Sequence, residues 1–225
     1  MRYTLFLSCL SLLTAFNLTN AYDARLTLEI LEAAVPSSAG QGQCPQATFK
    51  EECRNAQQAL APLRESFIKY GIDSVGAEAA IIALIAYESG SFAFNINHWP
   101  GRAGQGTRNM MMFPGIHEYV KSLASVNRRY LKVIANLSEP FSEEKQNEIR
   151  ALVLDDRESF ASAAWYLTKS SECPRDTLEK LRANTEDAFK YYTLSCVKTD
   201  GSTLPDRIAI WKRVTDAYKA HDNEI

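Results

Sequence analysis

The chain has 225 residues, 46% of them hydrophobic, with 25 lysines and arginines against 27 aspartates and glutamates. This length and composition are typical of one globular domain with a sizeable core. The net charge of −2 lacks the basic excess of a nucleic-acid-binding face, and it argues against tight binding of a strongly anionic polymer. A neutral polymer remains compatible with this charge.

Residues 1–21 have the pattern of a secretory signal peptide. Arg2 precedes an apolar stretch over residues 5–16, and the small residue Ala21 stands before the expected cleavage point. No other apolar run approaches the length of a membrane span. The sequence therefore predicts a secreted, extracellular monomer without a membrane-spanning segment.

The cysteines indicate two disulfides. Cys9 leaves with the signal peptide, and four cysteines remain in an oxidising compartment. Three connectivities are possible, and short loop closure favours Cys44–Cys53 and Cys173–Cys196. Asn136-Leu137-Ser138 is an N-glycosylation sequon, which lies on the surface if it is used.

The remaining chain is expected to be a lead-in followed by one mainly α domain. Residues 22–45 hold a short amphipathic piece at 24–35 and then Pro36-Ser-Ser-Ala-Gly-Gln-Gly-Gln, a composition typical of a flexible segment. We expect the folded domain over residues 46–225, with almost no strands. Helical periodicity is present at 48–70, 76–88, 115–136, 143–154, 158–169, 177–192 and 204–221.

The second helical pattern ends on an acid, Glu88, and Gly90 follows it. The residues three, four and seven positions before the acid are Ile85, Leu84 and Ile81, so its carboxylate shares the apolar face. Burial and the helix dipole should raise its pKa, giving the protonated form that a general acid in glycoside cleavage needs. The alternative is an acid that swings into water at a frayed helix end, with Gly90 as an ordinary C-cap.

Four short segments occur in the same order as in a known family. They are Tyr87-Glu-Ser-Gly90, Gly104-Gln-Gly-Thr-Arg-Asn-Met110, Phe160-Ala-Ser-Ala-Ala-Trp-Tyr-Leu167 and Arg207-Ile-Ala-Ile-Trp-Lys-Arg213. Over about residues 70–218 the chain resembles the lysozyme-like superfamily, and family 19 chitinases more than lytic transglycosylases. The Glu-Ser pair is also similar to that of transglycosylases and goose-type lysozymes. The stretch from Asn97 to Met110 resembles a group of secreted fungal proteins of this kind, for which no activity can be carried over.

The resemblance implies a lysozyme-like single domain with a long loop over a cleft. It implies that Glu88 protonates the glycosidic oxygen of a β-1,4 polymer containing N-acetylglucosamine, either chitin or peptidoglycan. Asn109 stands where the chitinases have Gln, and an amide offers a donor and an acceptor together. The polar and aromatic candidates for binding the sugar are Asn97, Gln105, Arg108, Asn109 and Tyr119. Bracing a loop is an equally weighted role for Arg108, and a core position is favoured for Trp165.

The chain departs from the chitinases in one respect. An inverting glycosidase needs a second carboxylate roughly 6.5–9.5 Å from the acid, yet residues 89–117 contain no Asp or Glu. Capping, surface or loop roles are favoured for the acids that the fold could bring in, which are Asp73, Glu78, Glu118, Asp155 and Asp156. Two interpretations stay open: a secreted glycosidase or transglycosylase with one acid, and a non-catalytic secreted polysaccharide-binding or effector protein.

Other chemistries have less support in the sequence. His98, His117 and His221 lack metal-ligand spacing, so no metal or cofactor is expected. There is no Gly-x-Ser-x-Gly elbow and no phosphate-binding loop. The run Met110-Met-Met-Phe113 is expected to pack under the cleft.

Overall fold

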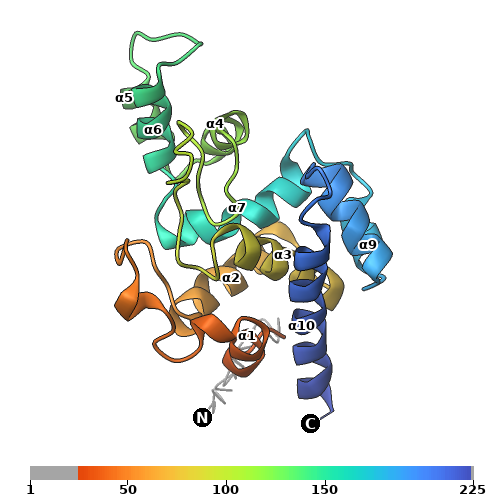
Figure 1. Ribbon diagram of the computed structural model, residues 1–225. Helices are drawn as coiled ribbons and strands as arrows, with labels where there is room; N and C mark the ends of the chain where they lie inside the picture. Colours follow the sequence, from red (N-terminus) through yellow and green to blue (C-terminus); the bar gives the residue numbers. More distant parts are fainter. Residues whose placement is uncertain (1–24, 224–225) are drawn as a thin grey trace, which may run out of the picture.

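The computed structural model describes residues 25–223 and is mainly α-helical (Figure 1), which confirms the mainly α class predicted from the sequence. Within these residues, the extended pairing consists of isolated bridges that join Ile96 to Gly106 and Gly106 to Met111. The α-helices are α1 (Leu28–Ala34), α2 (Ala56–Tyr70), α3 (Val75–Glu88), α4 (Phe113–Ser122), α5 (Asn127–Val133), α6 (Glu143–Ala151), α7 (Asp156–Lys169), α8 (Thr177–Leu181), α9 (Glu186–Tyr191) and α10 (Leu204–Asp222). Short 3₁₀ turns η1 (Pro36–Ser38) and η2 (Cys44–Gln46) and the π-helical turn η3 (Tyr192–Cys196) complete the described elements.

Helix α3 is the central element, and it is buried on every side. Its residues from Gly76 to Ala86 are all buried, which is typical of a helix surrounded by other elements rather than lying on a surface. The Ser74 hydroxyl caps its first turn by accepting from the Ala77 N–H at 3.3 Å. Gly76 lets α8 approach, because a Cβ there would lie 2.0 Å from the Leu181 carbonyl oxygen. The central helix thus carries its last residue, Glu88, to a fixed place.

Two hydrophobic clusters share helix α7. The large cluster surrounds α3, whereas the small cluster lies between α4, α5 and α6. Phe160, Ala164 and Leu167 follow a helical stripe that faces the large cluster, and Trp165 turns to the small one. Figure 1 shows α4, α5 and α6 gathered above α7 as a lobe that projects from the body. The fold therefore has two lobes joined along one helix.

Two expected helices are interrupted by turns. The helix expected at 115–136 is divided into α4 and α5, because the turn between them buries Leu123 and Val126 in the small cluster. The helix expected at 177–192 is divided into α8 and α9. A new cap starts the second piece, since the Thr185 hydroxyl accepts from the Ala188 N–H.

The segment expected to be a flexible lead-in belongs to the folded domain from Leu26 onward. Helix α1 buries Ile30 and Leu31 in the large cluster, and Arg213 of α10 donates to the carbonyl of Ala34 at 2.9 Å. The composition of residues 36–43 favoured flexibility. The structure is instead determined by the apolar face of α1, which precedes this segment and packs into the large cluster. The expected signal peptide, residues 1–21, lies outside the described residues.

An acid on α3 joins the two ends of the described chain. Glu78 is 3% exposed, and its carboxylate accepts from Arg25 at 2.7 Å and from the Tyr218 hydroxyl at 2.7 Å. Burial raises the pKa of this carboxyl, although both hydrogen bonds act in the opposite direction. The contact ties the start of the fold and helix α10 to α3.

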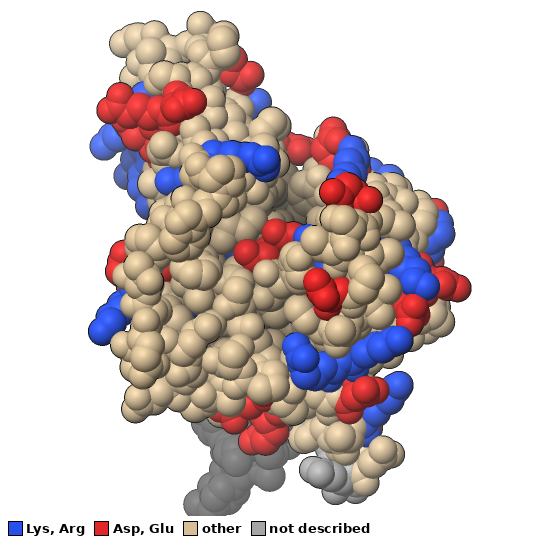
Figure 2. Space-filling view, in the orientation of Figure 1, with Lys and Arg blue, Asp and Glu red and all other residues tan. Residues whose placement is uncertain are grey.

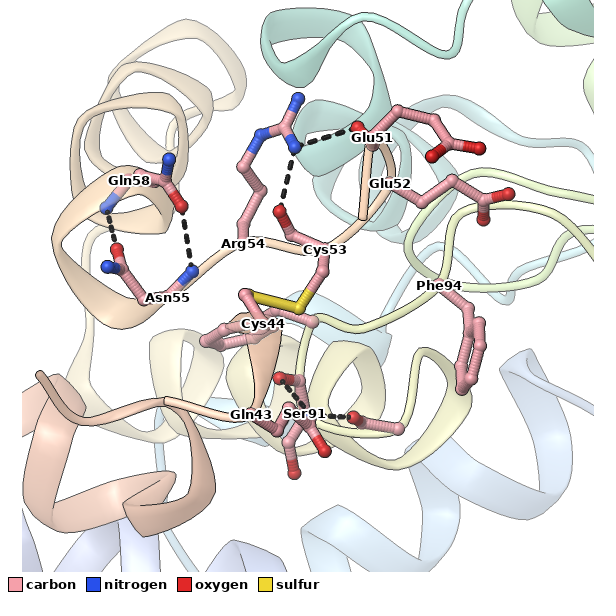
Figure 3. The surroundings of a disulfide bond; sticks show 12 residues. Gln43, Cys44, Glu51, Glu52, Cys53, Arg54, Asn55, Gln58, Ser91 and Phe94 are labelled. Carbon is pink, nitrogen blue, oxygen red and sulfur yellow. Dashed lines mark hydrogen bonds between the residues drawn. A yellow bond between two sulfur atoms is a disulfide. The ribbon is translucent and has the colours of Figure 1, made fainter. Parts of the chain in front are cut away.

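The disulfides Cys44–Cys53 and Cys173–Cys196 both form, as loop closure predicted. Figure 3 shows the first bond and the Gln43 side chain directed at the backbone near Ser91, where it donates to the carbonyls of Gly90 and Ser91. Disulfides persist in oxidising compartments, so both bonds are consistent with a secreted protein. Among residues 25–223 no helix combines the length and apolarity needed to cross a bilayer.

Candidate ligand-binding cleft

A cleft of about 690 Å³ lies where α3 ends, between the small lobe and the segment after η3. This volume is in the range of small-molecule binding sites. Figure 2 shows the hollow below the projecting lobe, with acidic and basic atoms at its edges. Its lining comes from α3, the loop before α4, α4 itself, α7 and two later loops, and includes Glu88, Arg102, Gln105, Asn109, the methionines Met110–Met112, Glu118, Tyr166, Glu172 and Lys198.

The helix ends at Glu88 as the sequence predicts. Ser89 caps it by donating its hydroxyl to the Ile85 carbonyl at 2.6 Å, and Gly90 takes the left-handed conformation at φ 58°. The Glu88 side chain is 21% exposed and opens on the cleft. Its carboxylate accepts from the Arg207 guanidinium of α10 at 2.5 Å. The sequence placed Glu88 on an apolar face and gave it no basic partner, whereas the structure pairs it with this arginine.

Arg207 is held in place on both sides. Its guanidinium lies 4.0 Å from the centroid of the Tyr87 ring, and its Nε donates to the Thr203 hydroxyl at 3.0 Å. Sequence reasoning placed this arginine in a family segment but did not pair it with Glu88. No local pattern could have done so, since the two residues are 119 positions apart.

The charges of the cleft lining largely compensate one another. Glu88 is paired with Arg207, and Glu172 with Lys198. Glu118 accepts weak hydrogen bonds from Ser170 and Ser171, and the exposed Arg102 carries the opposite charge on the same lining. With Arg207 counted, the three acids of the lining are matched by three bases, and this balance favours neutral ligands over ions.

Two predicted amides line the cleft. Asn109 has its Oδ1 fixed by the hydroxyls of Thr107 and Ser162, each at 2.8 Å, which leaves its carboxamide nitrogen as the group available to a ligand. Gln105 donates its Nε2 to the Met110 carbonyl at 2.9 Å. Its Oε1 is buried with no protein partner in the described part of the chain. A buried acceptor without a donor costs about 1–3 kcal/mol, and water or a ligand hydroxyl relieves that cost.

Arg108 is a brace and not a ligand-binding residue in this structure. It is 0% exposed, and it donates to the carbonyls of Phe92 at 2.8 Å, Phe94 at 3.1 Å and Glu52 at 2.6 Å. Asp156 lies 3.6 Å from it. Burial lowers the pKa of Arg108 to about 10, which is still high enough to keep it charged at neutral pH. Of the two roles weighed for this residue, the structure has the loop-bracing one.

Tyr119 is also placed differently from the expectation. It is 0% exposed in the small cluster, and its hydroxyl donates to the Glu158 carbonyl at 2.9 Å. Its ring packs against Trp165 at 4.9 Å between centroids. Both aromatics are core residues because the apolar face of α4 packs against α7. Asn97 lines a smaller hollow beside Glu88, described below.

The acids considered as a second carboxylate have separate structural roles. Asp73 pairs with Arg182, Asp155 caps α7 and Asp156 pairs with Arg54. Glu78 belongs to the buried contact described above, and Glu118 is the member of this set that lines the cleft. Among residues 25–223, no group of three or more His, Cys, Asp or Glu side chains is arranged to hold a metal ion.

Comparison with known proteins gives one informative match. The chain is 31% identical over 161 residues to a bifunctional dioxygenase (DOX)-epoxy alcohol synthase (EAS) of Fusarium oxysporum (strain Fo5176). It is similar to part of a fungal enzyme. The match covers 72% of this chain but 12% of the relative's length. No family model and no solved structure matches the chain.

This comparison contradicts the glycosidase expected from the sequence. The activities named for the relative are oxygenation and epoxy alcohol formation, and neither is cleavage of a glycosidic bond. In the structure the carboxylate of Glu88 accepts from Arg207 at 2.5 Å, a contact that the expectation did not include. Three of the four short segments that resembled chitinases contribute residues to the cleft lining, but they do not establish that chemistry.

Proposed function

We propose that the protein is a binding domain whose cleft holds a neutral, hydroxyl-rich molecule without cleaving it. The observation that carries the proposal is the paired state of the charges around Glu88 and Glu172, which leaves amides and apolar surface to contact a ligand. Asn109 offers an N–H donor, and Gln105 offers a buried oxygen without a partner. Hydroxyl groups match both, because each donates and accepts.

An oligosaccharide is the ligand class that fits this lining. Its hydroxyls suit the amides, and the C–H faces of its rings suit the wall formed by Met110, Met111 and Met112. A fatty acid or phosphate carries a net charge that the compensated lining does not attract. The short match within a much longer enzyme supports a domain that recurs beside other domains.

The lysozyme-like architecture is part of the same proposal. It is supported by the mainly helical fold and by a cleft at the end of an apolar helix. Secretion is proposed with it, supported by the pattern of residues 1–21 and the two disulfides, and the monomeric state stays an expectation from the sequence.

Isothermal titration with two neutral β-1,4 hexamers, one of N-acetylglucosamine and one of glucose, tests the function. We expect saturable binding of at least one hexamer, which mass spectrometry then recovers intact. Asn109→Ala should weaken binding roughly three- to tenfold, the range for one lost hydrogen bond. Gln57→Ala removes an exposed amide on α2 and serves as the matched control. The proposal would be refuted if neither hexamer bound at millimolar concentration, or if a bound hexamer were cleaved.

A further inference from the structure

Trp99 is the exposed member of the three tryptophans. Its exposed fraction is 68%, against 2% for Trp165 and 6% for Trp211. A single exposed apolar residue needs no explanation, but Trp99 belongs to an organised aromatic group. The ring centroids of Phe94, Phe49 and His98 lie 5.8, 6.0 and 5.5 Å from that of the tryptophan.

His98 anchors this group to the disulfide loop. Its imidazole stacks on the Phe49 ring at 3.6 Å with an interplanar angle of 2°, and its Nε2 lies 2.7 Å from Glu52 Oε1. The other oxygen of Glu52 accepts from the backbone N–H groups of Asn95 at 2.9 Å and Ile96 at 3.2 Å. Figure 3 shows Glu52 extending from the loop closed by the Cys44–Cys53 bond toward the segment that carries Phe94. The backbone that leads to Trp99 is thus fixed.

Asn97 closes the turn on the other side. Its Oδ1 accepts from the N–H of Gly101 at 3.0 Å and of Arg102 at 3.4 Å. The turn therefore has internal hydrogen bonds that do not involve the indole of Trp99. The aromatic face stays exposed although its supporting backbone is held, which reduces the conformational entropy that a ligand must remove on binding.

The aromatic group adjoins the cleft. A hollow of about 170 Å³ is lined by Phe94, Ile96, Asn97, His98 and Trp99 together with Glu88, Gln105 and Met110. The last three residues also line the main cleft. A ligand that fills the cleft and passes Gln105 consequently reaches the tryptophan.

We propose that Trp99, supported by Phe94 and His98, is a stacking subsite for one sugar ring of an oligosaccharide whose other rings occupy the cleft. This inference rests on the proposed function and deepens it. The indole offers a broad apolar face with a negative quadrupole, and the axial C–H groups of a pyranose present an apolar, weakly positive face. The contact needs no hydrogen bond to a particular hydroxyl group of the sugar. It extends the site by one ring, so it adds affinity for longer chains.

The test compares long and short ligands on three variants. With the hexamer that wild type binds, Trp99→Ala should weaken affinity at least tenfold, whereas Trp99→Phe keeps an aromatic face and should lose less than threefold. The corresponding dimer is expected to occupy the cleft without reaching Trp99, so all variants should bind it within twofold of wild type. Ile68→Ala, which trims a residue that is 54% exposed on α2, is the control for loss of exposed apolar surface and should match wild type.

Tryptophan fluorescence supplies an independent readout. Iodide reaches Trp99 but not the buried Trp165 and Trp211, so saturating hexamer should suppress iodide quenching in wild type. Unchanged quenching, or hexamer affinity of Trp99→Ala within twofold of wild type, would overturn the subsite while leaving the binding function intact. Failure of wild type to bind any hexamer overturns the proposed function instead. Equal thermal midpoints for the variants verify that they fold.

Discussion

Replacement of Arg108 tests most directly how the loop over the cleft is built. The side chain connects three segments, because its guanidinium donates to the carbonyls of Phe92, Phe94 and Glu52. Phe92 has a φ of 71°, an unusual conformation for a residue with a side chain. Such a residue persists where its surroundings over-determine it. Arg108 is part of those surroundings, and its ring contact with Phe160 at 4.8 Å fixes its own position.

Arg108→Met keeps the length of the side chain and removes every donor. Three carbonyls then lose a charged partner, and Asp156, at 3.6 Å, loses one of its two arginines. A hydrogen bond from a charged group contributes about 1.5–3 kcal/mol, and two of the three that are lost are buried, so the free energy of unfolding should fall by about 3–5 kcal/mol. For a chain of this size the melting temperature should fall by roughly 6–20 °C.

Urea unfolding followed by circular dichroism measures the change in the unfolding free energy. Arg128→Met is the matched control, because Arg128 is exposed on α5, and it should stay within about 0.5 kcal/mol of wild type. A loss below about 1 kcal/mol for Arg108→Met would refute the bracing role. So would a normal melting temperature combined with lost hexamer binding, since that pattern belongs to a residue that contacts ligand.

Three further outcomes follow from other parts of the fold. Because burial raises the pKa of Glu78, the folded state binds more protons than the unfolded chain at pH values from 4.5 upward. Unfolding free energy should therefore fall as pH rises through that window, and Glu78→Gln should flatten the slope of urea midpoints against pH; an unchanged slope would contradict the assignment. Replacing both cysteines of Cys44–Cys53, which are 9 positions apart, with serine should lower the unfolding free energy by about 2.6 kcal/mol. The same replacement at Cys173–Cys196, which are 23 positions apart, should lower it by about 3.4 kcal/mol, because the loop it closes is longer. The reverse order in urea unfolding would show that native-state effects dominate loop closure. When wild type is expressed in a secretory host, N-glycosidase should lower its mass, and Asn136→Gln should abolish this change because it removes the exposed sequon. If the mass of wild type does not change, the sequon is not used.

The sequence predicted features that depend on local pattern. The end of α3 at Glu88 was readable because an apolar run meets Gly90, which supplies a left-handed cap. The pairing of the four cysteines was readable because short loops close at the lowest entropic cost. The place of Asn109 in the cleft was also anticipated, since it lies in the loop that follows the acid.

Features set by distant packing were not readable. Helix α1 looked like part of a lead-in because its partner α10 lies at the other end of the chain. The pairing of Glu88 with Arg207 joins residues 119 positions apart, and no spacing rule reports it. Tyr119 carries the same helical signal whether its ring faces a ligand or the core, and only the packing of α4 on α7 decides between them.

The division of the hydrophobic residues into two clusters has a consequence for local unfolding. Each cluster can lose its packing separately, and the small one depends on the short helices α5 and α6, which bury Tyr130 and Ile149 respectively. Short helices with few buried side chains open at low free energy. Amide protons of these two helices should exchange with solvent well before those of α3, which is buried on every side. The packing behind α4, which lines the cleft, can then open and reform while α3 keeps its native hydrogen bonds.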